Sequence, residues 1–218
     1  MIKKKQRVVI VDDHPMFRER LSQLINLELD MEVCGEADSA QEGIRLIRGT
    51  SPNLAIVDIT LKGSSGLELV KSIKALSIIV PVLVLSMHDE ALYAERALQA
   101  GASGYITKHQ ATEEVLSAIR RVLAGEIYLS EKMTTFFLKR LSAVGAKSFA
   151  RRLDRLTDRE LQVLEFIGCG YTTRAIAEAL KLGVATVDTY RARIKEKMDF
   201  RNAIELQHFA IRWVRDRE

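Results

Sequence analysis

The sequence of 218 residues predicts an α/β domain built on a five-stranded, doubly wound parallel sheet, followed by a smaller all-α domain. Strand and helix patterns alternate five times in the first half, and only helix patterns follow residue 153. The net charge also changes sign, from −2 in residues 1–130 (15 basic, 17 acidic) to +6 in residues 131–218 (18 basic, 12 acidic). A basic second half favours nucleic acid as its partner, although a solvated basic surface would look the same.

The domain bounds follow from these patterns. We place the first domain at residues 1–128, a linker at residues 129–152 and the second domain at residues 153–218. The linker has weak helical patterning at its start and then the small-residue stretch Ser142–Ser148, SAVGAKS, which is typical of a flexible connection.

Short, continuous apolar runs mark the strands of the first domain. They are Arg7–Val11, Val33–Glu36, Leu54–Val57, Val82–Leu85 and Gly104–Ile106. The segments between them carry apolar residues at helical spacing. These expected helices are Met16–Leu29, Ala40–Ile47, Leu67–Leu76, Ala91–Ala100 and Thr112–Ala124. Apolar strands separated by helices indicate a parallel sheet that is covered on both faces.

Composition excludes several classes of protein. Hydrophobic residues make up 47% of the chain and charged residues 28%, which is ordinary for a globular protein. The longest apolar run, Ile78–Leu85, is interrupted by Pro81, so we expect no membrane span. Cys34 and Cys169 follow no metal or redox spacing, and we expect two reduced thiols in a cytoplasmic protein.

Polar side chains stand where the predicted strands end. Asp12 and Asp13 follow the first strand, and the later strand ends carry Asp58, Ser86 and Lys108. The carboxyl ends of parallel strands share one edge of the sheet, where ligands bind. A lone aspartate there is usually a turn or a helix cap, so the inference depends on the whole set. Adjacent carboxylates about 4 Å apart repel by roughly 4 kcal/mol at an effective dielectric constant near 20, and Mg²⁺ or Mn²⁺ would offset this repulsion.

Residues from Arg7 to about Gly125 resemble the receiver domain of response regulators in two-component signalling, which has a flavodoxin-like fold. The residues that carry the resemblance are Asp12, Asp13, Asp58, Gly66, Ser86, Tyr105 and Lys108. The resemblance implies that a histidine kinase phosphorylates Asp58. It also implies that Mg²⁺, or Mn²⁺ in its place, is bound by Asp13, Asp58 and the backbone carbonyl of Thr60, with Asp12 assisting.

The resemblance gives roles to the remaining rim residues as well. Ser86 and Lys108 would hold the phosphoryl oxygens, and Ser86 with Tyr105 would act as a switch that links the site to the surface. Two positions depart from the family. His109 stands where a proline often follows the lysine, and Leu61-Lys62 replaces a frequent Met-Pro pair. Neither departure touches the phosphate chemistry directly.

The second half predicts four helices. The first begins after Thr157, which forms a capping box with Glu160, and ends near Gly168. The others are expected to start at Thr172 or Thr173, to run from Ala185 to Met198, and to run from Ala203 to Val214. In the third helix an apolar stripe is expected to be buried, at Val187, Tyr190, Ile194 and Met198. The outward face is basic, which is typical of a helix-turn-helix, although an ordinary amphipathic helix has the same pattern.

This half resembles the LuxR-type helix-turn-helix. The matching positions are Leu156, Thr157, Arg159, Glu160, Val163, Leu164, Gly170, Ile176, Ala177, Leu180, Thr186, Val187 and Ile194. A receiver joined to this module resembles the NarL/FixJ subfamily, which implies a homodimeric transcription regulator that binds promoter half-sites. RNA polymerase is a further candidate partner. The expected DNA-binding residues are Thr186, Asp188, Thr189, Arg191, Ala192, Arg193 and Lys195.

Two alternative functions are compatible with parts of the sequence. An aspartate-nucleophile phosphatase typically has a second acid two residues after the nucleophile, and here that position is Thr60. A DNA-binding regulator that ignores phosphorylation would not need the complete acidic set with Ser86 and Lys108. We therefore expect no enzyme activity beyond phosphorylation and dephosphorylation of the chain itself.

Overall fold

The computed structural model of the chain describes residues 5–88, 90–135, 153 and 155–215. The chain divides into two compact units, residues 1–142 and residues 143–218. The predicted flexible stretch Ser142–Ser148 lies outside the described residues. Each unit is considered by itself.

The first unit contains the predicted parallel sheet. Its strands are β1 (Gln6–Val11), β2 (Met31–Ala37), β3 (Leu54–Asp58), β6 (Val82–Ser86) and β7 (Gly104–Thr107). They lie in the order β2-β1-β3-β6-β7, and every neighbouring pair is parallel. The helices between them are α1 (Pro15–Asn26), α2 (Ala40–Thr50), α3 (Gly66–Ala75), α4 (Glu90–Ala100) and α5 (Ala111–Leu123). The five-stranded, doubly wound fold is therefore confirmed.

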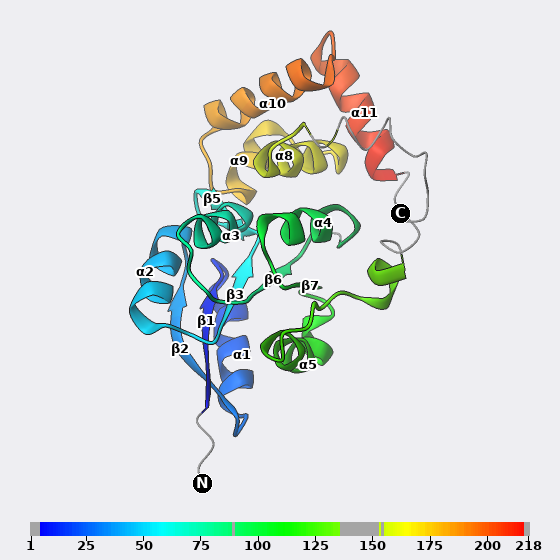
Figure 1. Cartoon of the computed structure of the whole chain (residues 1–218). Helices are drawn as coiled ribbons and strands as arrows, with labels where there is room; N and C mark the ends of the chain where they lie inside the picture. The colour runs from blue at the N-terminus through cyan, green and yellow to red at the C-terminus, as the bar shows by residue number, and fades with distance from the viewer. Residues whose placement is uncertain (1–4, 89, 136–152, 154, 216–218) are drawn as a thin grey trace. The chain divides into compact units, whose positions relative to one another are not determined.

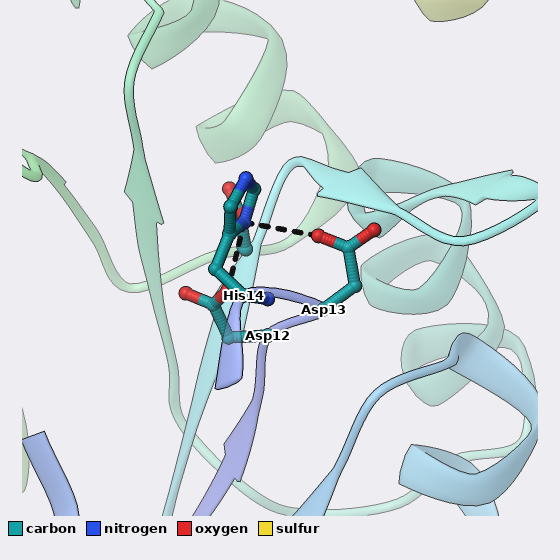
Figure 2. Close-up of side chains that lie close together, drawn as sticks. Asp12, Asp13 and His14 are labelled. Atoms are coloured by element: carbon teal, nitrogen blue, oxygen red, sulfur yellow. Dashed lines mark hydrogen bonds and ion pairs between the residues drawn. The ribbon is translucent and has the colours of Figure 1, made fainter. Parts of the chain in front are cut away.

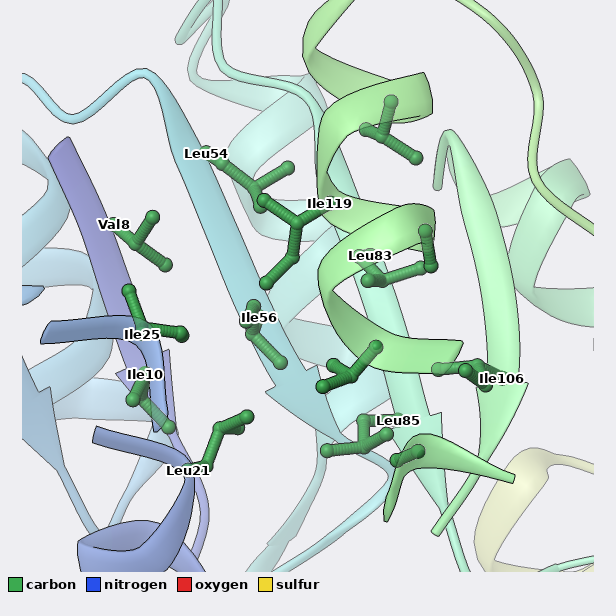
Figure 3. Close-up of a cluster of buried hydrophobic side chains, with 14 of the residues drawn as sticks. Val8, Ile10, Leu21, Ile25, Leu54, Ile56, Leu83, Leu85, Ile106 and Ile119 are labelled. Carbon is green, nitrogen blue, oxygen red and sulfur yellow. The ribbon is translucent and has the colours of Figure 1, made fainter. Parts of the chain in front are cut away.

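Both faces of the sheet are covered by helices (Figure 1). On one face, side chains of α1 and α5 pack against alternate residues of the strands, and Figure 3 shows this cluster. Its fully buried members include Val8, Ile10, Ile25, Ile56, Leu83 and Ile119. The opposite face is covered by α2, α3 and α4, which contact β1, β3 and β7 respectively. Burial on both faces explains why the strands read as continuous apolar runs.

Several element bounds and one small strand pair differ from the expectation: α2 continues to Thr50 and β2 spans Met31–Ala37. Helix α1 ends at Asn26 rather than at Leu29, and Leu27 and Leu29 are mostly exposed. Their apolar character misled the prediction because they do not continue the buried face of the helix. A small antiparallel pair, β4 (Thr60–Leu61) with β5 (Ser64–Ser65), follows β3 and was not predicted. Such a two-residue pair has no sequence periodicity of its own.

Gly66, the first residue of α3, lies against the strand that carries Asp58. Its backbone N–H donates to the carbonyl of Ile59 over 2.7 Å. A Cβ atom at this position would lie 1.8 Å from the carbonyl oxygen of Asp58. Only glycine lets the helix start this close to the end of β3.

Beyond α5, the chain returns along the edge of the sheet. Tyr128 forms a parallel bridge with Gly104 of β7, and residues 131–135 are helical. We call residues 128–135 the exit segment, because they lead out of the first unit.

The described part of the second unit is all-α, as predicted. Its helices are α8 (Asp158–Gly168), α9 (Thr173–Ala179), α10 (Val184–Met198) and α11 (Ala203–Arg215). The capping box is confirmed, because the Thr157 hydroxyl accepts from the Glu160 N–H and the Glu160 carboxylate accepts from the Thr157 N–H. Thr172 caps α9 through a hydrogen bond from Ala175 N–H.

The packing of α10 follows the predicted stripe with one correction. Val187, Ile194 and Met198 are buried, whereas Tyr190 is only half-buried. A tyrosine combines an apolar ring with a hydroxyl that favours solvent, so a position at the margin of the core suits it.

Candidate functional site

The carboxyl edge of the sheet brings together the five rim residues that the strand pattern singled out. Asp12 and Asp13 come directly after β1, Asp58 and Ser86 end β3 and β6, and Lys108 follows β7. All five are nearly inaccessible to solvent, with exposed fractions of 0–6%. Buried charges are costly unless they are paired or bind a metal, so this cluster marks a functional site.

Lys108 lies at the centre of the cluster. Its Nζ atom is 2.7 Å from Oδ2 of Asp58 and 2.6 Å from Oδ2 of Asp12, so one ammonium is shared by two carboxylates. The same atom lies 4.6 Å from the centre of the Phe17 ring, a favourable cation–π position. The Lys108 backbone N–H donates to the carbonyl of Ser86 over 2.7 Å, which fixes the lysine to the end of β6.

The carboxylates exceed the cations that neutralise them. Burial raises the pKa of the Asp12 carboxyl, the charge of Asp58 raises it further, and Lys108 only partly opposes both effects. The raised pKa shows that the single positive charge of Lys108 does not fully neutralise the buried carboxylates. A further positive charge would stabilise their ionised forms.

His14 is a member of the site that the sequence reasoning missed. Its Nδ1 atom lies 3.0 Å from Asp13 Oδ1 and 3.2 Å from Asp12 Oδ1 (Figure 2). The same atom lies 3.6 Å from Asp58 Oδ2. The nearby Asp58 carboxylate raises the pKa of the imidazole most, and Asp12 and Asp13 add to this against the opposing effects of burial and Lys108. Its place directly after the aspartate pair was the available signal.

The donor set fits a divalent cation. Asp12, Asp13, His14 and Asp58 each offer a ligand atom, and these atoms lie within 4.8 Å of one another. Carboxylate oxygens are the ligands that Mg²⁺ and Mn²⁺ prefer. Thr60 stands beside this group, since its backbone N–H donates to Asp58 Oδ1 over 3.3 Å. Positive charge from a cation would relieve the repulsion between the buried carboxylates.

His88 connects the two predicted switch residues. Its backbone N–H donates to the Ser86 hydroxyl over 3.1 Å, and its carbonyl accepts from the Tyr105 hydroxyl over 2.9 Å. Its Nε2 atom is also 3.0 Å from Oγ1 of Thr60. Tyr105 is fully buried, so its hydroxyl is held next to the loop that follows β6. The structure thus joins Ser86 to Tyr105 through the backbone of one intervening residue.

The predicted DNA-binding residues lie on α10. Thr186, Asp188, Thr189, Ala192 and Arg193 are exposed, and Arg191 and Lys195 are half-buried. The Thr189 hydroxyl donates to the carbonyl of Ala185 over 2.9 Å, which orients this side chain on the helix. The preceding helix, α9, is joined to α10 by the short turn of residues 180–183, as a helix-turn-helix requires.

Comparisons with known proteins agree with both units. Residues 8–120 match the response regulator receiver domain, and residues 154–210 match the luxR family of bacterial regulatory proteins. The chain is 32% identical to the nitrate/nitrite response regulator protein NarL of Escherichia coli, covering 91% of each chain. It is 31% identical to the response regulator UvrY of Escherichia coli, covering 94% of this chain and 93% of UvrY. A LuxR-family response regulator from Aurantimonas sp. superposes with a TM-score of 0.60 at 34% identity, covering 64% of this chain and 100% of that structure.

The fold, the acidic rim and these matches define a receiver domain joined to a helix-turn-helix. The chain belongs to the two-component response regulators that carry a LuxR-type DNA-binding domain. Its relatives include proteins named as transcriptional regulators, and its receiver domain implies a histidine kinase as partner. Within the described residues, no helix has the length and apolar character needed to cross a membrane.

Proposed function

We propose that Asp58 accepts a phosphoryl group from a histidine kinase and that this modification controls DNA binding. The observation that carries the proposal is the buried cluster in which Lys108 Nζ lies within 2.7 Å of both Asp58 and Asp12. A carboxylate is a competent nucleophile toward phosphorus when nearby cations offset the charge that accumulates in the transition state.

Each residue of the rim would have a separate role in phosphoryl transfer. An oxygen of Asp58 attacks phosphorus, and the bond from phosphorus to the kinase histidine breaks. Lys108 is positioned to leave Asp12 and to bind a phosphoryl oxygen, and the Ser86 hydroxyl donates to a second one. Asp12, Asp13, Asp58 and the Thr60 carbonyl would hold Mg²⁺ or Mn²⁺, which supplies further positive charge at the phosphoryl oxygens. Beyond its own phosphorylation and dephosphorylation, we assign the chain no enzymatic reaction.

Modification at Asp58 would then be read by the DNA-binding unit. We propose that Ser86 and Tyr105 form the switch, since both are hydrogen-bonded to the backbone of His88. The protein would bind two promoter half-sites as a homodimer in the cytoplasm, and RNA polymerase is a further proposed partner. The bases would be contacted from α10 by Asp188, Thr189 and Ala192, while Arg191, Arg193 and Lys195 face mainly phosphates. Thr186 is a further proposed DNA-binding residue.

Labelling with a small phosphodonor tests the proposal. With acetyl phosphate and Mg²⁺, we expect an acid-stable, base-labile phosphoryl label that Asp58→Asn abolishes. Asp13→Ala should also prevent labelling, by weakening the metal site. The matched control is Asp38→Asn, because Asp38 also follows a strand of the sheet but is exposed. Equal labelling of Asp58→Asn would place the acceptor elsewhere.

Two further measurements separate the alternatives. Turnover of a phosphate ester would favour a phosphatase, and we expect none. Mapping of DNA sites with and without phosphodonor distinguishes a switched regulator from a phosphorylation-independent one. The proposal requires that the phosphodonor change the occupancy of the sites and that Asp58→Asn remove this change.

A further inference from the structure

The exit segment is tied to the first residue of α4 by a buried carboxylate. Glu90 accepts two hydrogen bonds from Ser130, one from the backbone N–H over 3.0 Å and one from the hydroxyl over 2.5 Å. Only 8% of Glu90 is exposed. Hydrogen bonds to an ionised group are stronger than neutral ones, particularly where water is excluded. The contact therefore fixes the exit segment to α4 across 40 residues of sequence.

Ser130 is also hydrogen-bonded to the short helix that follows it. Its hydroxyl accepts from the Met133 N–H over 3.1 Å, and its carbonyl accepts from the hydroxyl of Thr134. The Ser130 hydroxyl therefore donates to Glu90 and accepts from the helix at the same time, and these two hydrogen bonds fix its orientation. Met133 is almost fully buried, so the first turn of the helix is packed against the receiver as well.

The other end of the exit segment is held by the second switch residue. The Tyr105 backbone N–H donates to the carbonyl of Tyr128 over 2.9 Å, while the Tyr105 hydroxyl donates to His88. Glu90 stands only two residues after His88. The loop that contains His88 is therefore connected to the exit segment twice, through Tyr105 and Tyr128 and through Glu90 and Ser130.

We propose that the Glu90–Ser130 contact is an output clamp, closed in the unphosphorylated receiver and opened by phosphorylation of Asp58. This inference rests on the phosphorylation proposed above. In the closed state, the Ser86 hydroxyl accepts from the His88 N–H. A side chain occupies one staggered rotamer at a time, so a Ser86 hydroxyl that turns toward a phosphoryl group leaves His88. The loop then moves, Glu90 moves with it, and the exit segment is released toward the DNA-binding unit.

Hydrogen–deuterium exchange on the full chain tests the clamp. The probe is beryllofluoride with Mg²⁺, a stable mimic of an aspartyl phosphate. In the wild-type protein we expect exchange of the exit segment to rise by about tenfold when the probe binds. In Glu90→Ala and Ser130→Ala, exchange should already be fast without the probe. Glu90→Ala removes both hydrogen bonds of the contact, whereas Ser130→Ala removes only the one from the hydroxyl, so the double variant should behave like Glu90→Ala.

The matched control is Tyr128→Phe. It removes the 2.6 Å hydrogen bond from the Tyr128 hydroxyl to Glu114, which holds the same segment to α5 and not to α4. The response of this variant to beryllofluoride should stay at the wild-type level. DNA affinity provides a second readout. The increase in affinity that beryllofluoride produces should be about tenfold smaller in the two clamp variants than in the wild-type protein.

The outcomes separate the clamp from the proposed function. If beryllofluoride protects the loops around Asp58 but leaves exchange of the exit segment unchanged, the clamp is wrong and phosphorylation at Asp58 stands. If the wild-type protein shows no response at Asp58, both proposals are overturned. If Tyr128→Phe loses its response to beryllofluoride to the same extent as Ser130→Ala, the effect belongs to the whole exit segment and the clamp is overturned.

Discussion

The Nζ atom of Lys108 lies 2.7 Å from Oδ2 of Asp58, and both side chains are almost completely buried. A buried ion pair of this kind stabilises a fold only while both partners are present, because removal of one leaves the other charge without compensation. Since Asp12 shares the same ammonium, a single lysine balances two carboxylates. This arrangement ties the stability of the receiver to the charge state of its site.

The first prediction concerns Lys108→Met. We expect this change to lower the free energy of unfolding by about 3 kcal/mol without metal, because it leaves the buried carboxylates to repel one another. Added Mg²⁺ should recover part of the loss by replacing the missing charge. Urea unfolding followed by circular dichroism, with and without Mg²⁺, measures both values. Lys62→Met, at an exposed position, is the control. A loss that is the same in both conditions would refute the charge argument.

The second prediction concerns the pH dependence of the DNA-binding unit. Burial alone raises the pKa of the Glu160 carboxyl, but hydrogen bonds from Lys197 and Thr157 outweigh it and hold the pKa below its ordinary value. A lowered pKa gives stability that is fully present above the unfolded pKa, near 4.3, and is lost as the pH falls through the folded pKa.

Glu160→Gln should therefore cost about 1–3 kcal/mol at neutral pH, and its difference from the wild-type protein should shrink as the pH falls toward about 3. Trp213, the single tryptophan of the chain, is buried in this unit, so its fluorescence reports the transition selectively. Glu178→Gln, an exposed glutamate, is the control. A constant difference between wild type and Glu160→Gln across this pH range would contradict the assignment.

The third prediction concerns base recognition by Asp188, an exposed carboxylate on α10. A carboxylate repels the phosphate backbone, so it is useful there only if it accepts from cytosine N4 or orients a neighbouring arginine. Asp188→Ala should relax the base preference and raise non-specific affinity. Selection of binding sites from a random DNA library measures this. An unaltered preferred sequence would show that the register assigned to α10 is wrong, and Thr189 with Arg193 would be tested next.

The fourth prediction assigns Lys195 to the phosphate backbone. Lys195→Ala should weaken binding to all sequences alike and reduce the slope of log affinity against log salt by about 1. Titrations at several salt concentrations, with specific and non-specific DNA, check both parts. A loss confined to the specific sequence would instead assign Lys195 to a base.

The fifth prediction is that the two domains fold independently. Limited proteolysis should cut preferentially between about residues 131 and 152, and the two fragments should each give a cooperative melt. The net charges of the two halves have opposite signs, and this difference motivates the expectation. Absence of a preferred cut, together with fragments that do not melt cooperatively, would rule it out.

The parts of the site that could be predicted from sequence are those at the ends of apolar strands. Asp58 and Lys108 could be placed on one edge because strand ends in a parallel sheet share that edge. His14 was missed because it begins the turn into α1, where no pattern in the sequence fixes the direction of a side chain. The contact between Glu90 and Ser130 was also missed, since it joins two polar residues far apart in the chain, and no periodicity reports such pairs.

The capping box was predictable for the opposite reason. Thr157 and Glu160 are three residues apart, so their reciprocal hydrogen bonds are a property of the local sequence. The burial of Glu160 against Lys197 is not, because it depends on how α8 packs against α10. Local hydrogen bonds can thus be predicted from the sequence. The ion-pair partners that shift the pKa of a side chain depend on tertiary packing and cannot.

The close approach of Gly66 to the Asp58 carbonyl has a consequence for genetic screens. A library of substitutions through this region, scored for transcription alone, would show residue 66 to be as intolerant as the phosphoacceptor, although a glycine carries no reactive group. The defect would come from the clash of any Cβ atom with the Asp58 carbonyl oxygen of β3, only 1.8 Å away. Thermal melts of the purified variants would expose the difference, because replacement of Asp58 by Asn leaves room for the fold and replacement of Gly66 by Ala does not.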